Sequence, residues 1–328
     1  MIKSKKELHG LHFISKVTID NGLGLKLVLS SYGASIYECY LNDVKITESP
    51  SYKEFLSSLC YYGKTAGRTA GRIKNGLVTI DGKKYRLAYK KIHSLHGGKG
   101  FSFRNYKTMI KDKEDEIVVK FIHISRDMDQ GYPGQLANEI VYRLSKKENS
   151  FTIDLKARSK KDTICNLTNH TYWNLNGDRG SILKHRVFID AEEYVKIDNN
   201  LLKIGVEKVN DTFDFRKEKE IGSNLFDNEI QEIATGYDHD WIISSSKSSP
   251  QLVVTGDKSH IRMEVYTSNP VCHIYTNNYA KEDEKYNSMA IEMQKRVFDV
   301  EKGAIDLKKN ELYHEFIKYR FIEEKQDE

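Results

Sequence analysis

One acidic residue stands in an otherwise apolar stretch, MAIEMQ at 289–294. If this stretch is a strand, Glu292 and Gln294 face the same side, because successive side chains alternate between the two faces. A carboxylate inside an apolar strand costs several kcal/mol unless it is partnered or its pKa is shifted. Glu292 is therefore the best single candidate for a general base.

A second segment, NLTNHTYWNLNG at 166–177, is rich in amides and aromatic rings. Its asparagines surround His170, Tyr172 and Trp173 in the sequence. Amides donate to and accept from hydroxyl groups, and aromatic rings pack against C–H faces. This combination is typical of sites for polar, uncharged ligands such as sugars.

Two glycine-rich segments carry further candidates. GRTAGRIKNG at 67–76 places Arg68 and Arg72 among glycines, and SLHGG at 94–98 places two glycines directly after His96. Glycines let the backbone approach a ligand closely, and a guanidinium offers a fork of N–H donors. The alternative is a turn with two solvent-exposed arginines, and a histidine with a structural role. A phosphate loop is excluded, because the G-x-x-x-x-G-K-[ST] order is absent.

The segment GYDHDW at 236–241 places Asp238, His239 and Asp240 after a turn. Metal binding is one interpretation of such a group. Metal-ligand spacing such as H-E-x-x-H is absent, however, so we expect no metal here.

Composition excludes several classes of protein. The chain has 328 residues, and its 52 Lys and Arg against 47 Asp and Glu give a net charge of +5 that is spread along its length. We therefore expect no nucleic acid and no membrane surface as partner, and no apolar run reaches the roughly 18–20 residues of a membrane span. The N-terminal MIKSKKELHG lacks the apolar region of a signal peptide. The cysteines are scattered without a C-x-x-C pair, which predicts a reducing, cytoplasmic location.

The hydrophobic pattern predicts an all-β protein, a large antiparallel β-sandwich with few short helices. Helical pattern is limited to 222–234 and to a turn or two within 52–60, and the loop at 244–251 is expected to join the two strands of a hairpin. We expect one domain over residues 1–328. Alternation with a period of two predicts strands at 25–29, 117–124, 151–157, 186–190 and 261–266.

Taken in order, these segments resemble the aldose 1-epimerases, also called galactose mutarotases. NLTNHTYWNLNG is the most specific match, being close to the family's N-L-T-N-H-[ST]-Y-[FW]-N-L-x-G. Any one match would be weak, whereas colinear matches through nearly the whole chain are strong. The resemblance implies a large β-sandwich with a long cleft across one sheet. The matching segments are GRTAGRI at 67–73, SLHGG at 94–98, GYPGQL at 131–136, NLTNHTYWNLNG at 166–177, DTFDFR at 211–216, GYDHD at 236–240 and the acidic motif at 291–294.

The resemblance also implies a role for each matching residue. Glu292 matches the family's catalytic base and His170 its catalytic acid, while Arg72, His96 and Asp238 match residues that hold the sugar hydroxyls and ring oxygen. The implied reaction interconverts the α and β anomers of hexoses such as galactose and glucose by opening and closing the ring, with no cofactor. Glu292 should then start ionised and His170 protonated, with pKa values that straddle neutrality.

Three positions depart from the family pattern. Gly71 stands where many members have Asn, and LKIGVE at 202–207 departs from the usual I-P-T-G-E. His273 stands where many have Gln, which still allows a substrate contact. If His273 binds substrate, KM should rise as the pH falls through its titration. The alternative places His273 one strand position off the cleft, packed beside Tyr275.

Two other functions use the same fold. One is a hexose-phosphate epimerase, which would need additional Lys or Arg at the cleft rim to bind a phosphate dianion. The other is a carbohydrate-binding protein without activity. In each case the expected partner is a small-molecule sugar, and the protein is expected to be a monomer or a homodimer.

Overall fold

Strands dominate the fold, and nearly all of them pair antiparallel. Most belong to three sheets of nine, seven and five strands. Two short α-helices lie within the described residues, α1 (Tyr52–Ser57) and α2 (Asn228–Gln231). The all-β fold predicted from the sequence is thus confirmed. The computed structural model describes residues 1–10, 12–89, 92–244, 248–297 and 303–324.

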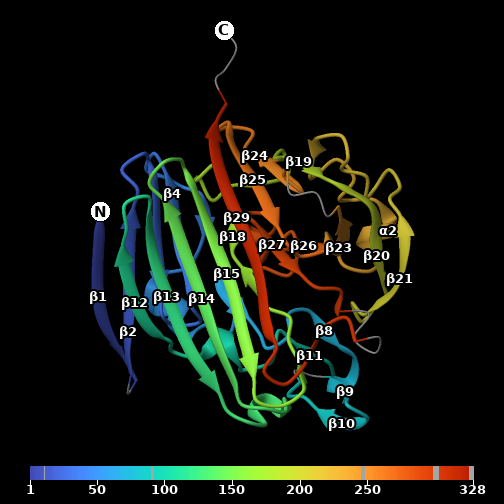
Figure 1. The fold of residues 1–328 in the computed structure, drawn as a ribbon. Helices are drawn as coiled ribbons and strands as arrows, with labels where there is room; N and C mark the ends of the chain where they lie inside the picture. Colours follow the sequence, from blue (N-terminus) through green and yellow to red (C-terminus); the bar gives the residue numbers. More distant parts are fainter. Residues whose placement is uncertain (11, 90–91, 245–247, 298–302, 325–328) are drawn as a thin grey trace.

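The nine-stranded sheet crosses the front of the molecule in Figure 1. Its long central strands carry inward apolar side chains that alternate with polar ones; in β15, for example, Phe151, Ile153 and Leu155 are buried. In order across the sheet, the strands are β12 (Lys107–Asp112), β13 (Glu116–Ser125), β14 (Leu136–Ser145), β15 (Ser150–Ser159), β29 (Leu312–Glu323), β25 (Ile261–Thr267), β24 (Leu252–Thr255), β19 (Arg186–Ile189) and β22 (Lys219–Glu220).

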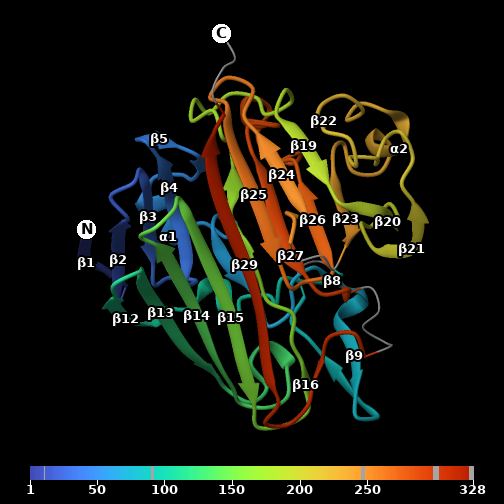
Figure 2. The same ribbon diagram turned by 45° about the horizontal axis from the view of Figure 1, so that its top comes forward.

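The seven-stranded sheet carries most of the residues that the sequence singles out. Its strands β23, β26 and β27 lie behind the nine-stranded sheet in Figure 1, and Figure 2 shows β20, β21 and α2 at the opposite side of the molecule from α1. In order, the strands are β21 (Lys203–Lys208), β20 (Ala191–Ile197), β23 (Asp238–Ile243), β26 (Val271–Tyr275), β27 (Met289–Gln294), β18 (Tyr172–Trp173) and β6 (Thr47–Glu48).

The remaining strands form the five-stranded sheet and four short pairs. Two of these pairs, β7 with β17 and β8 with β11, carry His170 and Arg72 to the site described below. The five-stranded sheet consists of β1 (Ile2–His9), β2 (His12–Asp20), β3 (Leu25–Ser30), β4 (Ser35–Leu41) and β5 (Val44–Lys45). The pairs are β7 (Lys64–Ala66) with β17 (Thr168–His170), β8 (Arg72–Ile73) with β11 (Ser94–Leu95), β9 (Leu77–Ile80) with β10 (Lys83–Arg86) and β16 (Thr163–Ile164) with β28 (Asp306–Leu307).

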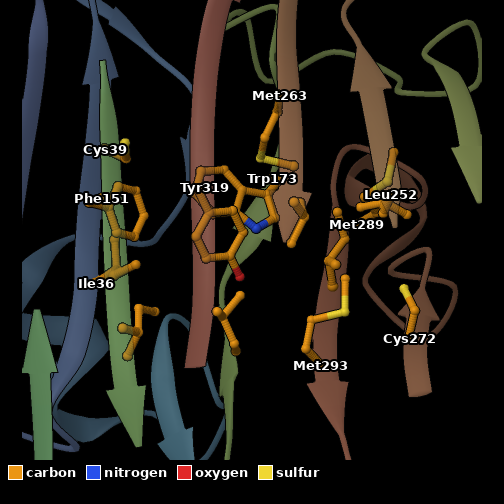
Figure 3. Close-up of a cluster of buried hydrophobic side chains, with 14 of the residues drawn as sticks. Ile36, Cys39, Phe151, Trp173, Leu252, Met263, Cys272, Met289, Met293 and Tyr319 are labelled. Carbon is orange, nitrogen blue, oxygen red and sulfur yellow. The ribbon is translucent and has the colours of Figure 1, made fainter. Parts of the chain in front are cut away.

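An apolar core joins the sheets. Figure 3 shows the Trp173 ring of β18 against Tyr319 of β29, with ring centroids 5.0 Å apart, and Phe151 packs on Tyr319 at 5.0 Å. This cluster of buried residues draws members from Val17 to Phe321. Such continuity supports the single domain that we propose for residues 1–328. No helix in the described ranges is long and apolar enough to cross a membrane.

The five strands predicted from alternation are confirmed as β3, β13, β15, β19 and β25, with ends shifted by at most two residues. The turn of helix expected within 52–60 is also confirmed, as α1. The longer helix expected over 222–234 is wrong, because only Asn228–Gln231 is α-helical. Gly222 N–H donates to the Leu183 carbonyl at 2.9 Å, and Leu225 N–H bonds only three residues back, so this segment opens as turns.

The hairpin expected at 244–251 is also wrong. The strand before it, β23, belongs to the seven-stranded sheet, whereas the strand after it, β24, belongs to the nine-stranded sheet. This segment therefore passes from one sheet to the other, and positions 245–247 of it lie outside the described residues. Alternation marks the strands, but it carries no information on which strand is the partner.

We predict that Phe151→Ala lowers the free energy of unfolding by about 3–5 kcal/mol, because it leaves a cavity beside the Tyr319 ring in the core. The matched control is Phe13→Ala, since Phe13 is 65% exposed; its loss should be within about 0.5 kcal/mol. Urea-induced unfolding measures both. A loss below about 1 kcal/mol for Phe151→Ala would show that this packing is not central.

Candidate active site

Three ionisable side chains lie in a row across three neighbouring strands. The register places Asp240 of β23 opposite His273 of β26, and His273 opposite Glu292 of β27. Nδ1 of His273 lies 2.7 Å from Oδ1 of Asp240, and Nε2 of His273 lies 4.0 Å from Oε1 of Glu292. Residues directly opposite each other share one face of a sheet, so the register brings all three side chains together.

Asp238 extends this row, because it lies two residues before Asp240 and faces the same side. Its Oδ1 lies 3.1 Å from Nε2 of His273, and its Oδ2 accepts from Nη2 of Arg72 at 3.3 Å. Burial by itself would raise the pKa of this carboxyl, but the charges of Arg72 and His273 outweigh burial and hold the pKa well below its usual range. Asp238 is therefore an ionised acceptor at neutral pH.

His96 is fixed by a tight turn directly after β11. Its backbone has a φ of 49°, in the left-handed region, and its N–H donates to the Gly71 carbonyl at 3.1 Å. Gly71 N–H in turn donates to Nδ1 of His96 at 3.3 Å, which leaves Nε2 as the nitrogen that carries the proton in the neutral ring. Only glycine fits next: a Cβ on Gly97 would lie 2.0 Å from the carbonyl oxygen of Gly67.

His170 ends β17 and points toward the same carboxylate. Its Nε2 lies 3.4 Å from Oε1 of Glu292, and Nδ1 of His96 lies 3.8 Å from Oε2. The Tyr61 ring packs on both imidazoles, with centroid distances of 4.7 Å to His96 and 5.7 Å to His170. Oε2 of Glu292 is buried without a hydrogen-bond partner among the described residues. Since an unsatisfied buried acceptor is costly, this atom is suited to accept from a ligand hydroxyl.

All of these groups except the fully buried Asp240 line one cleft of about 170 Å³. Its walls also include Lys203 and Gln294, and the aromatic faces come from Tyr61, Tyr172, Tyr275 and Tyr279. The six residues that the sequence predicted for the site all line it: Glu292, His170, Arg72, His96, Asp238 and His273.

Lys203 lines the cleft, although no role for it was expected from the sequence. It comes from β21 at the sheet edge, and its ammonium pairs with the buried carboxylate of Asp240. The only sequence signal was indirect, namely the departure of 202–207 from the family pattern. The pairing of β21 with β20 places this side chain at the cleft.

The asparagines of 166–177 and Arg68 have structural roles instead. Nδ2 of Asn169 donates to the Gly63 carbonyl at 2.8 Å, and Nδ2 of Asn174 donates to two backbone carbonyls. Arg68 is 2% exposed, and its guanidinium donates to the carbonyl of Pro133 at 2.9 Å. Of the two alternatives left open for this segment, the one with a solvent-exposed Arg68 is therefore wrong, and no asparagine of 166–177 lines the cleft.

Burial lowers the pKa of both His170 and His96. For His170, burial outweighs the raising effect of the nearby Glu292 charge, and for His96 the proximity of the His170 ring and of the Arg72 cation adds to burial. Both rings are therefore neutral at pH 7 in the unliganded site. The sequence-based expectation that His170 starts protonated is not met, because the ring lies in a largely desolvated cleft.

His273 behaves in the opposite way. Burial would lower its pKa, but hydrogen bonds to Asp238 and Asp240 outweigh burial and raise its pKa to about 9. The ring is thus a cation at pH 7, and its titration lies on the alkaline side. This overturns the expectation that KM would rise as the pH falls through this titration. The alternative position off the cleft is also wrong, because His273 lines it.

His96, His170 and Glu292 are the one group of potential metal ligands found among the described residues, with donor atoms within 4.8 Å of one another. Nδ1 of His96 already accepts from Gly71 N–H, and the sequence spacing of these residues is not that of a zinc site. The metal-free site stays a prediction.

A β-sandwich with a desolvated cleft of histidines, carboxylates and tyrosines defines a protein built for a polar, hydroxylated ligand. A sequence profile described as aldose 1-epimerase matches residues 15–320. An aldose 1-epimerase of Haemophilus influenzae is 32% identical over 278 residues, covering 80% of this chain and 78% of the relative. A human galactose mutarotase is 36% identical over 231 residues, covering 69% and 65%. The crystal structure of a galactose 1-epimerase from Lactobacillus acidophilus superimposes with a TM-score of 0.91 at 25% identity over 99% of both chains.

The chain therefore belongs to the aldose 1-epimerase family. It is an isomerase of the mutarotase type on a galactose mutarotase-like fold.

We predict that the imidazoles of His96 and His170 stay neutral from pH 8 down to the ordinary histidine value of ~6.5, because burial lowers both pKa values. Imidazole ¹⁵N NMR of the unliganded protein, with signals assigned by His96→Gln and His170→Gln, measures this directly. A doubly protonated His170 signal at pH 7 would contradict the analysis of its environment.

Proposed function

We propose that this enzyme interconverts the α and β anomers of hexoses such as galactose and glucose, with Glu292 as general base and His170 as general acid. The observation that carries the proposal is the Glu292 carboxyl, which is 1% exposed, has Oε2 unpartnered and lies 3.4 Å from Nε2 of His170. Ring opening requires a base that is free to accept the C1 hydroxyl proton and, beside it, an acid that can protonate the ring oxygen.

In this mechanism, Glu292 takes the proton from the C1 hydroxyl while the C1–O5 bond breaks. The electrons of that bond go to O5, which takes the proton from Nε2 of His170. The free aldehyde then rotates about the C1–C2 bond. Closure runs the two proton transfers in reverse and delivers the other anomer, so no group or electron leaves the substrate.

The pair must hold one proton on His170 when the sugar reacts. Burial disfavours the imidazolium of His170, whereas the Glu292 charge favours it. We propose that the reactive form is the one with this proton on His170 and with Glu292 ionised.

The other cleft residues orient the sugar. Asp238 accepts from hydroxyls, Arg72 and Nε2 of His96 donate to hydroxyl or ring oxygens, and His273 completes the polar contacts. Holding the sugar in one orientation brings C1–O1 to Glu292 and O5 to His170, which removes much of the entropic barrier. The faces of the tyrosines suit the C–H side of a hexose ring.

Charge pairing in the cleft disfavours a phosphorylated substrate. Among the described residues that line it, both permanent cations already pair with a carboxylate, Arg72 with Asp238 and Lys203 with Asp240. A phosphate dianion would have to break one of these pairs. A carbohydrate-binding protein without activity would not need a desolvated carboxylate beside an imidazole, so this alternative is also disfavoured.

A reducing, cytoplasmic compartment and a monomer or homodimer remain parts of the proposal. All four cysteines lie in the described ranges and are free, three of them buried. This supports a compartment in which thiols are kept reduced.

We predict that Glu292→Gln lowers kcat by about 100- to 10,000-fold, because the amide cannot take the C1 hydroxyl proton. The matched control is Glu264→Gln, since Glu264 is also buried, at 8% exposed, but lies on β25 outside the cleft. Circular dichroism checks that both variants are folded. A Glu292→Gln enzyme that keeps more than about a tenth of the rate would remove Glu292 from the role of base.

Polarimetry of freshly dissolved α-D-galactose and α-D-glucose tests the substrate class, with a hexose 6-phosphate as comparator. We expect both free hexoses to reach rotational equilibrium faster with enzyme than in buffer, and the phosphate to gain little. Preference for the phosphate would favour the hexose-phosphate epimerase, and no acceleration with any sugar would favour the non-catalytic protein.

A further inference from the structure

Two departures from the family pattern, far apart in the sequence, meet at one buried carboxylate. Nζ of Lys203, from the 202–207 segment, donates to Oδ2 of Asp240. Oδ1 of the same carboxylate lies 2.7 Å from Nδ1 of His273. The Asp240 side chain is 0% exposed and the Lys203 side chain is 9% exposed. The three side chains therefore form one connected group beneath the sugar cleft.

Charges alternate along this group and beyond it. Lys203 is paired with Asp240, Asp240 with His273, His273 with Asp238, and Asp238 with Arg72. A single buried charge without a partner is strongly destabilising, whereas alternating neighbours compensate one another. A neutral His273 would leave Asp238 and Asp240 with one positive neighbour each. The pattern is therefore complete only when His273 carries both ring protons.

The groups that face His273 come from every neighbouring element. Hydrogen bonds to Asp238 and Asp240, and the charges of Asp240 and Glu292, raise its pKa to about 9 in spite of burial. Two carboxylates within hydrogen-bond distance outweigh the more distant positive charges. The facing groups are Asp238, His239 and Asp240 of β23, Glu292 of β27, Lys203 of β21, Arg72 of β8, His170 of β17 and His96 after β11.

We propose that Lys203 and Asp240 are positioning residues that keep His273 doubly protonated, with Nδ1–H held by Asp240 and Nε2–H presented to the sugar beside Asp238. This inference rests on the proposed function, because the ligand it describes is the hexose. Asp240 fixes which nitrogen faces the cleft. Lys203 keeps Asp240 ionised: burial would raise the pKa of Asp240, but the charges of Lys203 and His273 outweigh burial and hold it at about 2.

For binding, the doubly protonated His273 offers the sugar only a hydrogen-bond donor, whereas the glutamine of many relatives would offer a donor and an acceptor. Without a ligand, Nε2–H of His273 donates to Oδ1 of Asp238, 3.1 Å away; a sugar hydroxyl that replaces this contact would accept from Nε2–H and donate to Oδ1. Loss of the Nε2 or Nδ1 proton breaks one side of this arrangement. KM should therefore rise as the pH rises through the titration of His273, with the effect absent at pH 6–7.

The first experiment measures His273 itself and is independent of any activity. Imidazole ¹⁵N NMR should show a doubly protonated His273 at pH 8, with the signal assigned by its loss in His273→Gln. In Asp240→Asn the midpoint should fall by one to two pH units. The double variant Asp240→Asn with Lys203→Met avoids leaving a lone buried ammonium, and it should show the same fall if the single variant is unstable. A wild-type His273 that is neutral at pH 7 would overturn the proposal even if the enzyme is fully active.

The second experiment measures KM for galactose against pH. A fall of two pH units in the midpoint corresponds to a KM raised about tenfold at pH 8 relative to the wild type. The Asp240→Asn effect should vanish when residue 273 is already changed by His273→Gln, which a merely structural role for Asp240 would not produce. The matched control is Lys196→Met. Lys196 of β20 forms an exposed ion pair with Glu207 of β21, so the KM profile of this variant should be that of the wild type.

Each outcome decides one part of the proposal. An unshifted His273 midpoint in Asp240→Asn and in the double variant would remove Asp240 and Lys203 as positioning residues. A shifted midpoint without any change in the KM profile would show that His273 does not contact the sugar. Absence of mutarotation in the wild type, by contrast, would reject the proposed function and leave the NMR result to stand.

Discussion

The register between β23, β26 and β27 is the constraint on which the site depends. It sets Asp240, His273 and Glu292 opposite one another on three neighbouring strands. A slip of one residue would turn each side chain to the other face of the sheet and break the row. The apolar residues between them, such as Ile291 and Met293, are buried in the core on the other face. Core packing and site geometry are therefore fixed by the same alternation.

Desolvation lowers the pKa of a histidine, and in this cleft the hydrogen-bond partners of each ring decide whether it does so. His96 and His170 lack a carboxylate in close hydrogen-bonding contact, so burial keeps them neutral. His273 has two such carboxylates, so the same burial is outweighed and the ring is a cation. One cleft thus contains two neutral histidines and a third that holds a fixed charge.

The scaffold uses polar residues as much as apolar ones. Arg68 is buried and donates to backbone carbonyls of the segment around Pro133, and Asn169 donates to Gly63. These bonds satisfy carbonyls in loops that no sheet pairs, which keeps the irregular segments next to the cleft in one conformation. Arg68 and Asn169 precede Arg72 and His170 closely in the chain, so these bonds help to position the segments that carry both site residues.

The sequence by itself determined the all-β class and most of the long strands, because alternation reports burial directly, and its motifs singled out six residues that the structure places around one cleft. It could not determine which strands pair, so the segment at 244–251 was taken for a hairpin although it links two sheets. It overestimated the helix at 222–234, since the N–H groups of Leu225 and Asp227 bond three residues back and form turns. It also assigned no role to Lys203 and left open whether Arg68 is buried. Only the tertiary structure decided these points and the opposite charge states of His170 and His273, because a pKa depends on what surrounds a side chain in space and not on its neighbours in the chain.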